Sequence, residues 1–185
     1  MAKLPRAVWL LPSALAALPA YHTARAVEYM SVAEAQRNAF EKATTFAPLA
    51  PPRAELDAAL TAVPESALGA AWSPKVWQAR SGDVAMGWLL VDQVIGKSEA
   101  ITFALALDPK GEIASLEILE YRETHGGEVR LAPWRKQFIG RTAHDPVRLD
   151  VDIRNISGAT LSCRHVTDGV RRLLALYEHA LRTSG

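Results

Sequence analysis

The chain has 185 residues, of which 49% are hydrophobic and 22% charged, with 11 glycines and 11 prolines. This composition is typical of one globular domain, alone or with a small appendage, and it excludes an intrinsically disordered chain. The formal net charge is +1. The sequence contains no long run of like charges, which excludes a nucleic-acid-binding tail. A single cysteine, Cys163, excludes an internal disulfide, so packing must hold the fold.

The first 26 residues contain no acidic residue, unlike the rest of the chain. Lys3 and Arg6 precede an apolar stretch over 7–20, and the small-x-small sequence Ala-Arg-Ala follows at 24–26. This order is typical of a signal peptide. The alternative is a membrane anchor, but the stretch contains two prolines and is shorter than the roughly 20 residues that span a bilayer. We expect cleavage after Ala26, which removes three cations and no acid and changes the net charge from +1 to −2.

Helical and extended patterns alternate in the next part of the chain. Ser31 and Glu34 have the spacing of a capping box, which predicts a helix over 32–44. Three prolines within 46–53 predict an extended connection. A second, short helix is expected over 55–63.

Four runs rich in valine, isoleucine and aromatic residues follow, and short turn sequences separate them. Such short connections cannot join parallel strands, so the runs predict an antiparallel meander. We expect one face of this sheet to be only partly solvated. The runs cover residues 76–80, 84–94, 101–107 and 113–121.

The rest of the chain is expected to be mainly helical. A short helix is predicted over 131–139, because Pro133 suits its first turn and Gly140 its end. A brief strand is predicted over 149–153, followed by a long helix over 162–183 with a continuous apolar stripe. Together these elements predict an α+β fold in which helices flank an antiparallel sheet.

A segment rich in small and hydroxyl-bearing residues, 155–162, precedes the final helix. A helix start offers unpaired amide donors and a partial positive charge, and Gly158 lets the backbone approach a ligand closely. A phosphate suits such a place, with Arg164 and His165 as further positive groups. The residues alone leave a second interpretation open, in which this segment only caps and turns into the helix. The hydroxyl groups belong to Ser157, Thr160 and Ser162.

The sequence Ser-Gly-Ala-Thr at 157–160, followed by Leu161 and Ser162, resembles the flavin-attachment motif of the FMN-binding domain family. That family includes periplasmic FMN-carrying subunits of the Rnf electron-transport complex and of the sodium-translocating NADH:quinone oxidoreductase. In it, a flavin transferase uses FAD as donor and joins FMN to the threonine hydroxyl through a phosphoester. The resemblance implies that Thr160 is this threonine and that FMN is the cofactor.

A second stretch supports the resemblance, which extends from about residue 31 to residue 176. Glu-Thr-His-Gly-Gly at 123–127, Trp134, and Gln-Phe-Ile-Gly at 137–140 are similar to family segments beside the flavin ring. His125 can then donate a hydrogen bond to the flavin ring, or gain and lose a proton near it and so shift its reduction potential. The alternative is that His125 is a solvated loop histidine. The implied cofactor-binding residues are Glu123, Thr124, His125, Gly126, Ser157, Gly158, Ala159, Thr160, Leu161 and Ser162.

The chain departs from the family pattern at several positions. Arg154 stands where the family has an acidic residue, and the nearest acid is Asp152. Non-covalent binding of FMN therefore stays open beside covalent attachment. In the upstream segment His125, Gly127 and Glu128 replace the proline, leucine and glycine of the family.

Other chemistry-bearing residues fit the pattern less well. His165 is placed either near the phosphate or partly buried in the helix, and Cys163 is expected to be a small buried residue. The tryptophans at 72, 77, 88 and 134 either stack on the ring or belong to the core. The histidines and the cysteine lack metal-ligand spacing, and no serine lies in a Gly-x-Ser-x-Gly elbow, so metalloenzymes and serine hydrolases are set aside.

The sequence therefore predicts an exported or periplasmic flavoprotein that binds FMN and relays electrons to or from a periplasmic or membrane redox partner. The alternative is a non-redox module that senses or docks within a membrane complex. An electron-transfer role is favoured over a stand-alone enzyme, because no second domain for a substrate is evident, and no catalytic residue is assigned. The predicted division is a signal peptide over 1–26, an N-terminal helical segment over 27–74 and the FMN-binding domain over 75–185.

Overall fold

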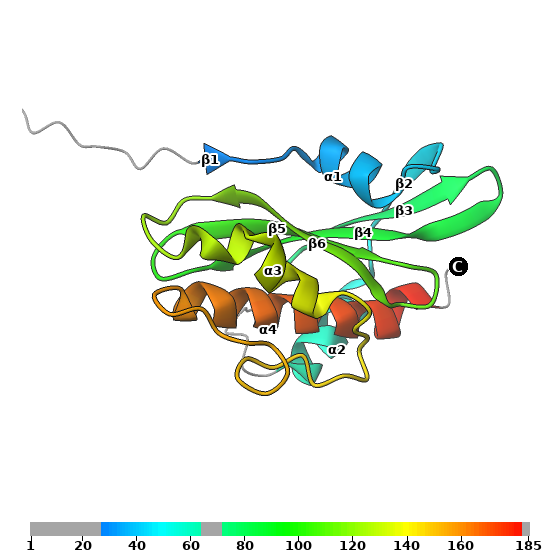
Figure 1. Cartoon of the computed structure of the whole chain (residues 1–185). Helices are drawn as coiled ribbons and strands as arrows, with labels where there is room; N and C mark the ends of the chain where they lie inside the picture. The colour runs from blue at the N-terminus through cyan, green and yellow to red at the C-terminus, as the bar shows by residue number, and fades with distance from the viewer. Residues whose placement is uncertain (1–26, 64–71, 183–185) are drawn as a thin grey trace, which may run out of the picture.

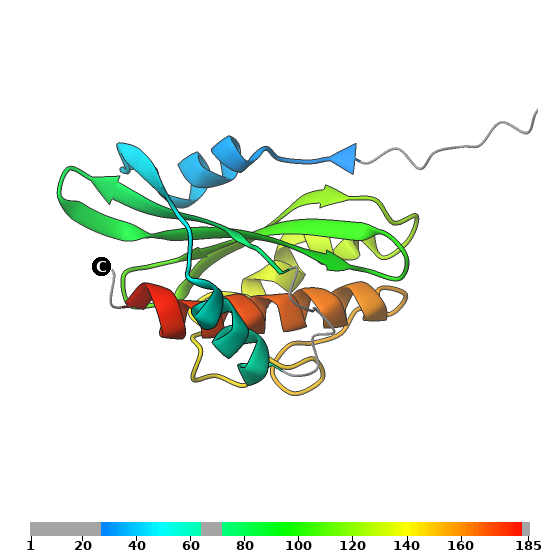
Figure 2. The same ribbon diagram turned by 180° about the vertical axis from the view of Figure 1, so that it is seen from behind.

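The computed structural model describes residues 27–63 and 72–182. These residues form one antiparallel sheet of six strands in the order β1-β6-β5-β4-β3-β2 (Figure 1). Helix α1 covers one face of the sheet, whereas α2, α3 and α4 lie on the other, as the two opposite views show (Figures 1 and 2). The predicted α+β class is thus confirmed, while the predicted signal peptide over 1–26 lies outside the described residues.

The four central strands confirm the predicted meander. Each pairs antiparallel with the next along the chain, and their bounds differ from the predicted runs by one residue at most. They are β3 Lys75–Ser81, β4 Val84–Ile95, β5 Ala100–Leu107 and β6 Ile113–Tyr121.

Successive side chains of β4 pack into two hydrophobic clusters, one on each face of the sheet. Trp88 and Leu90 belong to the larger hydrophobic cluster, on the side of α4, whereas Leu89 and Val91 belong to a smaller cluster on the side of α1. Successive side chains of a strand point to opposite faces, so one apolar run fills both clusters. The predicted stripe of the last helix is buried in the larger cluster, through Val166, Val170, Leu173, Leu174, Tyr177 and Leu181.

The N-terminal part adds both edge strands. The capping box of Ser31 and Glu34 forms as predicted, but α1 spans only Val32–Ala39 and ends at Phe40, whose backbone is not helical and whose side chain is buried in the smaller cluster. Strand β1 (Val27–Glu28) pairs with β6.

The extended connection predicted over 46–53 is in part a paired strand of the sheet. Strand β2 (Thr45–Leu49) pairs with β3 at the edge of the sheet, where Pro48 is tolerated because an edge strand leaves one side free of partners. Helix α2 (Arg53–Ala62) follows and packs against α4.

The C-terminal part differs from the prediction in two places. The predicted strand over 149–153 is a turn with a single bridge between Leu149 and Ile153. The last helix, α4 (Thr160–Leu176), begins two residues earlier than predicted and continues as the π-helical turn η3 (Tyr177–Leu181). Between β6 and α4 lie η1 (Gly127–Arg130), α3 (Ala132–Arg135) and η2 (Lys136–Phe138).

Among the helices of residues 27–63 and 72–182, none has the length and apolar character needed to cross a membrane.

A buried ion pair ties β4 to α4. Asp92 Oδ2 lies 2.7 Å from Arg172 Nη2, and the two residues are only 7% and 1% exposed. Asp92 Oδ1 accepts hydrogen bonds from Trp72 Nε1 at 3.0 Å and from its neighbour's backbone amide at 2.8 Å. The guanidinium also lies 5.2 Å from the centre of the Trp72 ring. These contacts compensate for the removal of two charges from water.

Candidate functional site

The glycine segment after β6 contacts the start of α4. The hydroxyl of Tyr121 donates to the backbone carbonyl of His125 and lies 3.0 Å from Ser162 Oγ. Gly126 has a φ of 86°, and a Cβ built there would lie 2.8 Å from Tyr121 Oη and 3.0 Å from Ser162 Oγ. The two motifs singled out in the sequence therefore meet in space, and only glycine fits at their contact.

A hollow of about 420 Å³ opens beside this contact. Residues 123–128 line one side, and Gly158 lines another. Tyr29 and Arg130 complete the wall, with the Arg130 guanidinium 4.9 Å from the centre of the Tyr29 ring. Its size lies within the range of about 300–1,000 Å³ that is usual for ligand sites.

Thr160 is the first residue of α4, and it is exposed. Its Oγ1 accepts a hydrogen bond of 3.1 Å from Asn155 Nδ2. The preceding residue, Ala159, is the N-cap of α4, and no side chain in the described part of the chain caps the helix. The interpretation that Ser157 or Ser162 caps this helix is therefore wrong, and the first amides of α4 remain available to an anion.

The backbone that leads to Thr160 is held by α3 and η2. Trp134 Nε1 donates to the carbonyl of Arg154 at 2.9 Å, and Gln137 Oε1 accepts from the Arg154 amide at 2.8 Å. A second hollow, of about 590 Å³, runs along this clamp and shares Glu128 and Leu131 with the first. Trp134 and Gln137 thus fix the segment that carries the Ser-Gly-Ala-Thr sequence.

Comparison with known proteins finds a similar family for this part of the chain. Residues 96–175 match the family model described as FMN-binding domain. These residues resemble an FMN-binding domain. It is also similar to a subunit of the ion-translocating oxidoreductase complex of Cronobacter sakazakii (strain ATCC BAA-894), with 29% identity over 119 residues. That similarity covers 58% of this chain and 57% of the relative, so the chain spans just over half of the relative's length.

FMN is the cofactor of the FMN-binding domain family, and the residues present fit it. The uncapped start of α4 and the exposed Thr160 hydroxyl suit a phosphate, which prefers amide and hydroxyl donors. The hollow beside Gly126 and Gly158 offers room close to the backbone for the rest of the cofactor. Of the residues predicted from the sequence, Thr124, His125, Ser157, Gly158, Thr160 and Leu161 are exposed around this place.

Two predicted site residues in the FMN-binding domain make internal contacts. Ser162 is 5% exposed, and its hydroxyl bonds Tyr121. Glu123 Oε1 accepts from the backbone amides of Lys97, Ser98 (2.6 Å) and Glu99 (2.9 Å) in the turn between β4 and β5. Burial opposes ionisation of Glu123, but these amides outweigh it and hold its pKa below the ordinary value. Glu123 thereby fixes a turn beside the hollow.

His165 also holds this turn. Its Nδ1 lies 2.6 Å from the carbonyl oxygen of Ile95 and 2.8 Å from that of Gly96. Because both partners are acceptors, Nδ1 carries the proton and donates to them. The contact anchors the first turns of α4 to the sheet, so of the two placements considered for His165 the structure favours the packed one.

Cys163 and the tryptophans belong to the core of the domain. Cys163 is fully buried, and burial raises the pKa of its thiol, as expected for a packing residue. Trp72, Trp88 and Trp134 lie in the larger hydrophobic cluster, and Trp77 packs against the smaller one. Within 27–63 and 72–182, no cluster of histidine, cysteine, aspartate or glutamate is suited to a metal ion.

Sequence reasoning missed four residues of this site. Tyr121 and Asn155 make the contacts that place the glycine segment and the Thr160 hydroxyl, and Tyr29 and Arg130 wall the hollow. For Asn155 a signal was present, because it lies inside the segment singled out for anion binding. For Tyr29, only the pairing of β1 with β6 brings it to the site.

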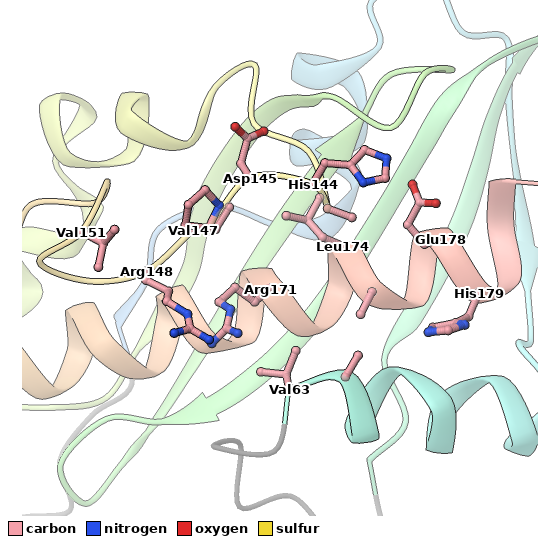
Figure 3. A pocket seen from close by; sticks show the side chains of 14 residues that line it. Val63, His144, Asp145, Val147, Arg148, Val151, Arg171, Leu174, Glu178 and His179 are labelled. Atoms are coloured by element: carbon pink, nitrogen blue, oxygen red, sulfur yellow. The ribbon is translucent and has the colours of Figure 1, made fainter.

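A third hollow lies apart from these residues, along the C-terminal half of α4. It measures about 600 Å³ and is bounded by the end of α2, the loop over 143–151 and α4 (Figure 3). Arg148 from the loop and Arg171 from α4 both line it, with Glu178 and His179 farther along α4 (Figure 3). It contains none of the site residues predicted from the sequence.

Replacing Gly126 by alanine is expected to separate the two motifs. The new Cβ would collide with Tyr121 Oη and Ser162 Oγ, so we expect a loss of unfolding free energy about 1–3 kcal/mol greater than for Gly140→Ala. Gly140 is the matched control, because its φ is also positive (77°) but nothing lies within 4 Å of a Cβ there. Urea unfolding of both variants measures the difference, and equal losses would contradict the contact.

Proposed function

We propose that this chain is an exported flavoprotein that carries FMN through a phosphoester at Thr160 and relays electrons to or from a redox partner. The observation that supports it most is the meeting of the two motifs at Gly126, beside a hollow that is lined by Gly158, two residues before the exposed Thr160. The similarity to a component of an ion-translocating oxidoreductase complex supports the redox role.

The residues of the chain have distinct tasks in this function. FMN supplies the electron-transfer chemistry when bound, and the protein supplies binding and electrostatics. The uncapped amides at the start of α4 favour the negative phosphate there. The segment over 123–128, held by Tyr121 and Glu123, forms the wall of the hollow.

The proposal includes partners and a location. A flavin transferase with FAD as the FMN donor would attach the cofactor, and a periplasmic or membrane redox partner, within a membrane-associated complex, would exchange electrons with it. Export would follow from a signal peptide over 1–26 with cleavage after Ala26. A covalent bond suits the periplasm, where lost FMN is not readily replaced. The division into 1–26, 27–74 and 75–185 stays a prediction.

Electron relay is tested with the FMN-loaded protein and membrane vesicles of its host supplied with NADH. We expect the visible absorbance of the flavin to bleach under anaerobic conditions and to return when an oxidised quinone is added. Boiled vesicles are the control. A flavin that stays oxidised with active vesicles would contradict the relay and favour the sensing or docking module.

A further inference from the structure

We infer that Asn155 is a positioning residue that orients the Thr160 hydroxyl for flavin attachment. The inference rests on the proposed function of Thr160 and adds a residue to it. Asn155 lies five residues before Thr160, outside the Ser-Gly-Ala-Thr sequence.

The orientation of the Asn155 amide is fixed by its two partners. Its Oδ1 accepts from the backbone amide of Ile156 at 2.8 Å, and a backbone N–H can only donate. The other end of the side chain, Nδ2, therefore faces Thr160 and donates to Oγ1 at 3.1 Å. The Thr160 oxygen is thus an acceptor in this contact, and its own proton is directed elsewhere.

This arrangement suits a hydroxyl that must react. In the attachment step, Thr160 Oγ1 forms a bond to the FMN-side phosphorus of FAD while the bond from that phosphorus to the bridging oxygen breaks. AMP leaves with the bridging oxygen, and the hydroxyl proton passes to a base of the transferase, so nothing is oxidised or reduced. Asn155 restricts rotation of the hydroxyl and leaves both its proton and a lone pair accessible, since Thr160 is exposed.

The hydrogen bond from Asn155 to Thr160 is also relevant to Arg154, which replaces the acidic residue of the family. The nearest acid, Asp152, accepts from the amides of Val147 at 3.1 Å and Arg148 at 2.7 Å, and lies 3.4 Å from Arg141 Nη1. Asp152 thus organises the preceding loop. Asn155 is the side chain that bonds the Thr160 hydroxyl in the described part of the chain.

The test measures the rate of covalent flavin incorporation into the full chain, with purified transferase and FAD, by intact mass. We expect Asn155→Ala to be about tenfold slower than wild type, the equivalent of one lost hydrogen bond. Asn155→Asp keeps the shape but lacks the donor and would accept the Thr160 proton, so we expect it to stay about as slow as Asn155→Ala. Unfolding midpoints should stay close to wild type, because Asn155 is exposed.

Val151→Ala is the control, because this exposed side chain of the preceding loop lines the third hollow, which contains none of the predicted site residues, and it should label at close to the wild-type rate. A wild-type rate for Asn155→Ala, or an equal loss for Val151→Ala, would overturn the inference while leaving attachment at Thr160 intact. A wild-type chain that takes up no flavin would overturn the proposed attachment and the inference with it.

Discussion

Thr160→Ala is expected to abolish covalent attachment of FMN. The variant lacks the hydroxyl that would form the phosphoester, and no other residue of the Ser-Gly-Ala-Thr sequence starts a helix with an exposed hydroxyl. The protein should be produced with a flavin transferase and exported, then separated by denaturing electrophoresis. Wild type should give a fluorescent flavin band, and the variant should give none.

Two controls sharpen this result. Thr160→Ser keeps a hydroxyl at the same place and should still become fluorescent. Wild type produced without the transferase should be colourless or contain FMN that is removed by dialysis. A fluorescent band that persists in Thr160→Ala would show that another residue carries the flavin, whereas a dialysable flavin in all samples would favour non-covalent binding.

Asp92→Asn is expected to lower the unfolding free energy by about 3–5 kcal/mol, because it leaves the charge of Arg172 buried without its counter-ion. The substitution keeps the shape and the acceptor for Trp72 Nε1 but replaces Oδ2, the acceptor for Arg172 Nη2, by an amide donor, so the loss reports the whole ion pair. Among residues 27–63 and 72–182, the Nε of Arg172 has no hydrogen-bond partner, which leaves the guanidinium more dependent on Asp92. Urea unfolding at neutral pH measures the effect.

The control is Glu178→Gln, which breaks the surface pair of the partly buried Glu178 and the exposed Arg182 and should cost no more than about 0.5 kcal/mol. A double replacement, Asp92→Leu with Arg172→Met, should recover much of the loss, because apolar side chains can replace a buried ion pair. A cost below about 1 kcal/mol for Asp92→Asn would mean that water reaches the pair, contrary to its burial.

The sheet could be predicted because its information is local. The central strands are rich in apolar and β-branched residues, and the turns between strands are too short for parallel pairing. Strand β2 was missed because Pro48 argues against a strand unless the strand lies at an edge, which depends on the complete sheet. The sequence predicted a strand over 149–153, where the structure has only a single bridge. Hydrogen bonds to the Asp152 carboxylate shape that loop more than β-propensity does.

The site was predicted in part for a similar reason. The motif sequences and their resemblance to a family identified the two segments, and the structure brings them together. The residues that join them could not be predicted, because the contact of Tyr121 with Ser162 spans 41 residues and follows no periodicity. Glu123 belongs to the predicted segment, yet its hydrogen bonds hold the turn between β4 and β5.

The most direct test of the proposed function is the intact mass of the exported protein after coexpression with a flavin transferase, followed by peptide mapping. We expect a chain that begins at Val27 and carries one FMN, located on the peptide that contains Thr160. A chain with no added mass, or FMN bound to a different peptide, would contradict covalent attachment at the start of α4.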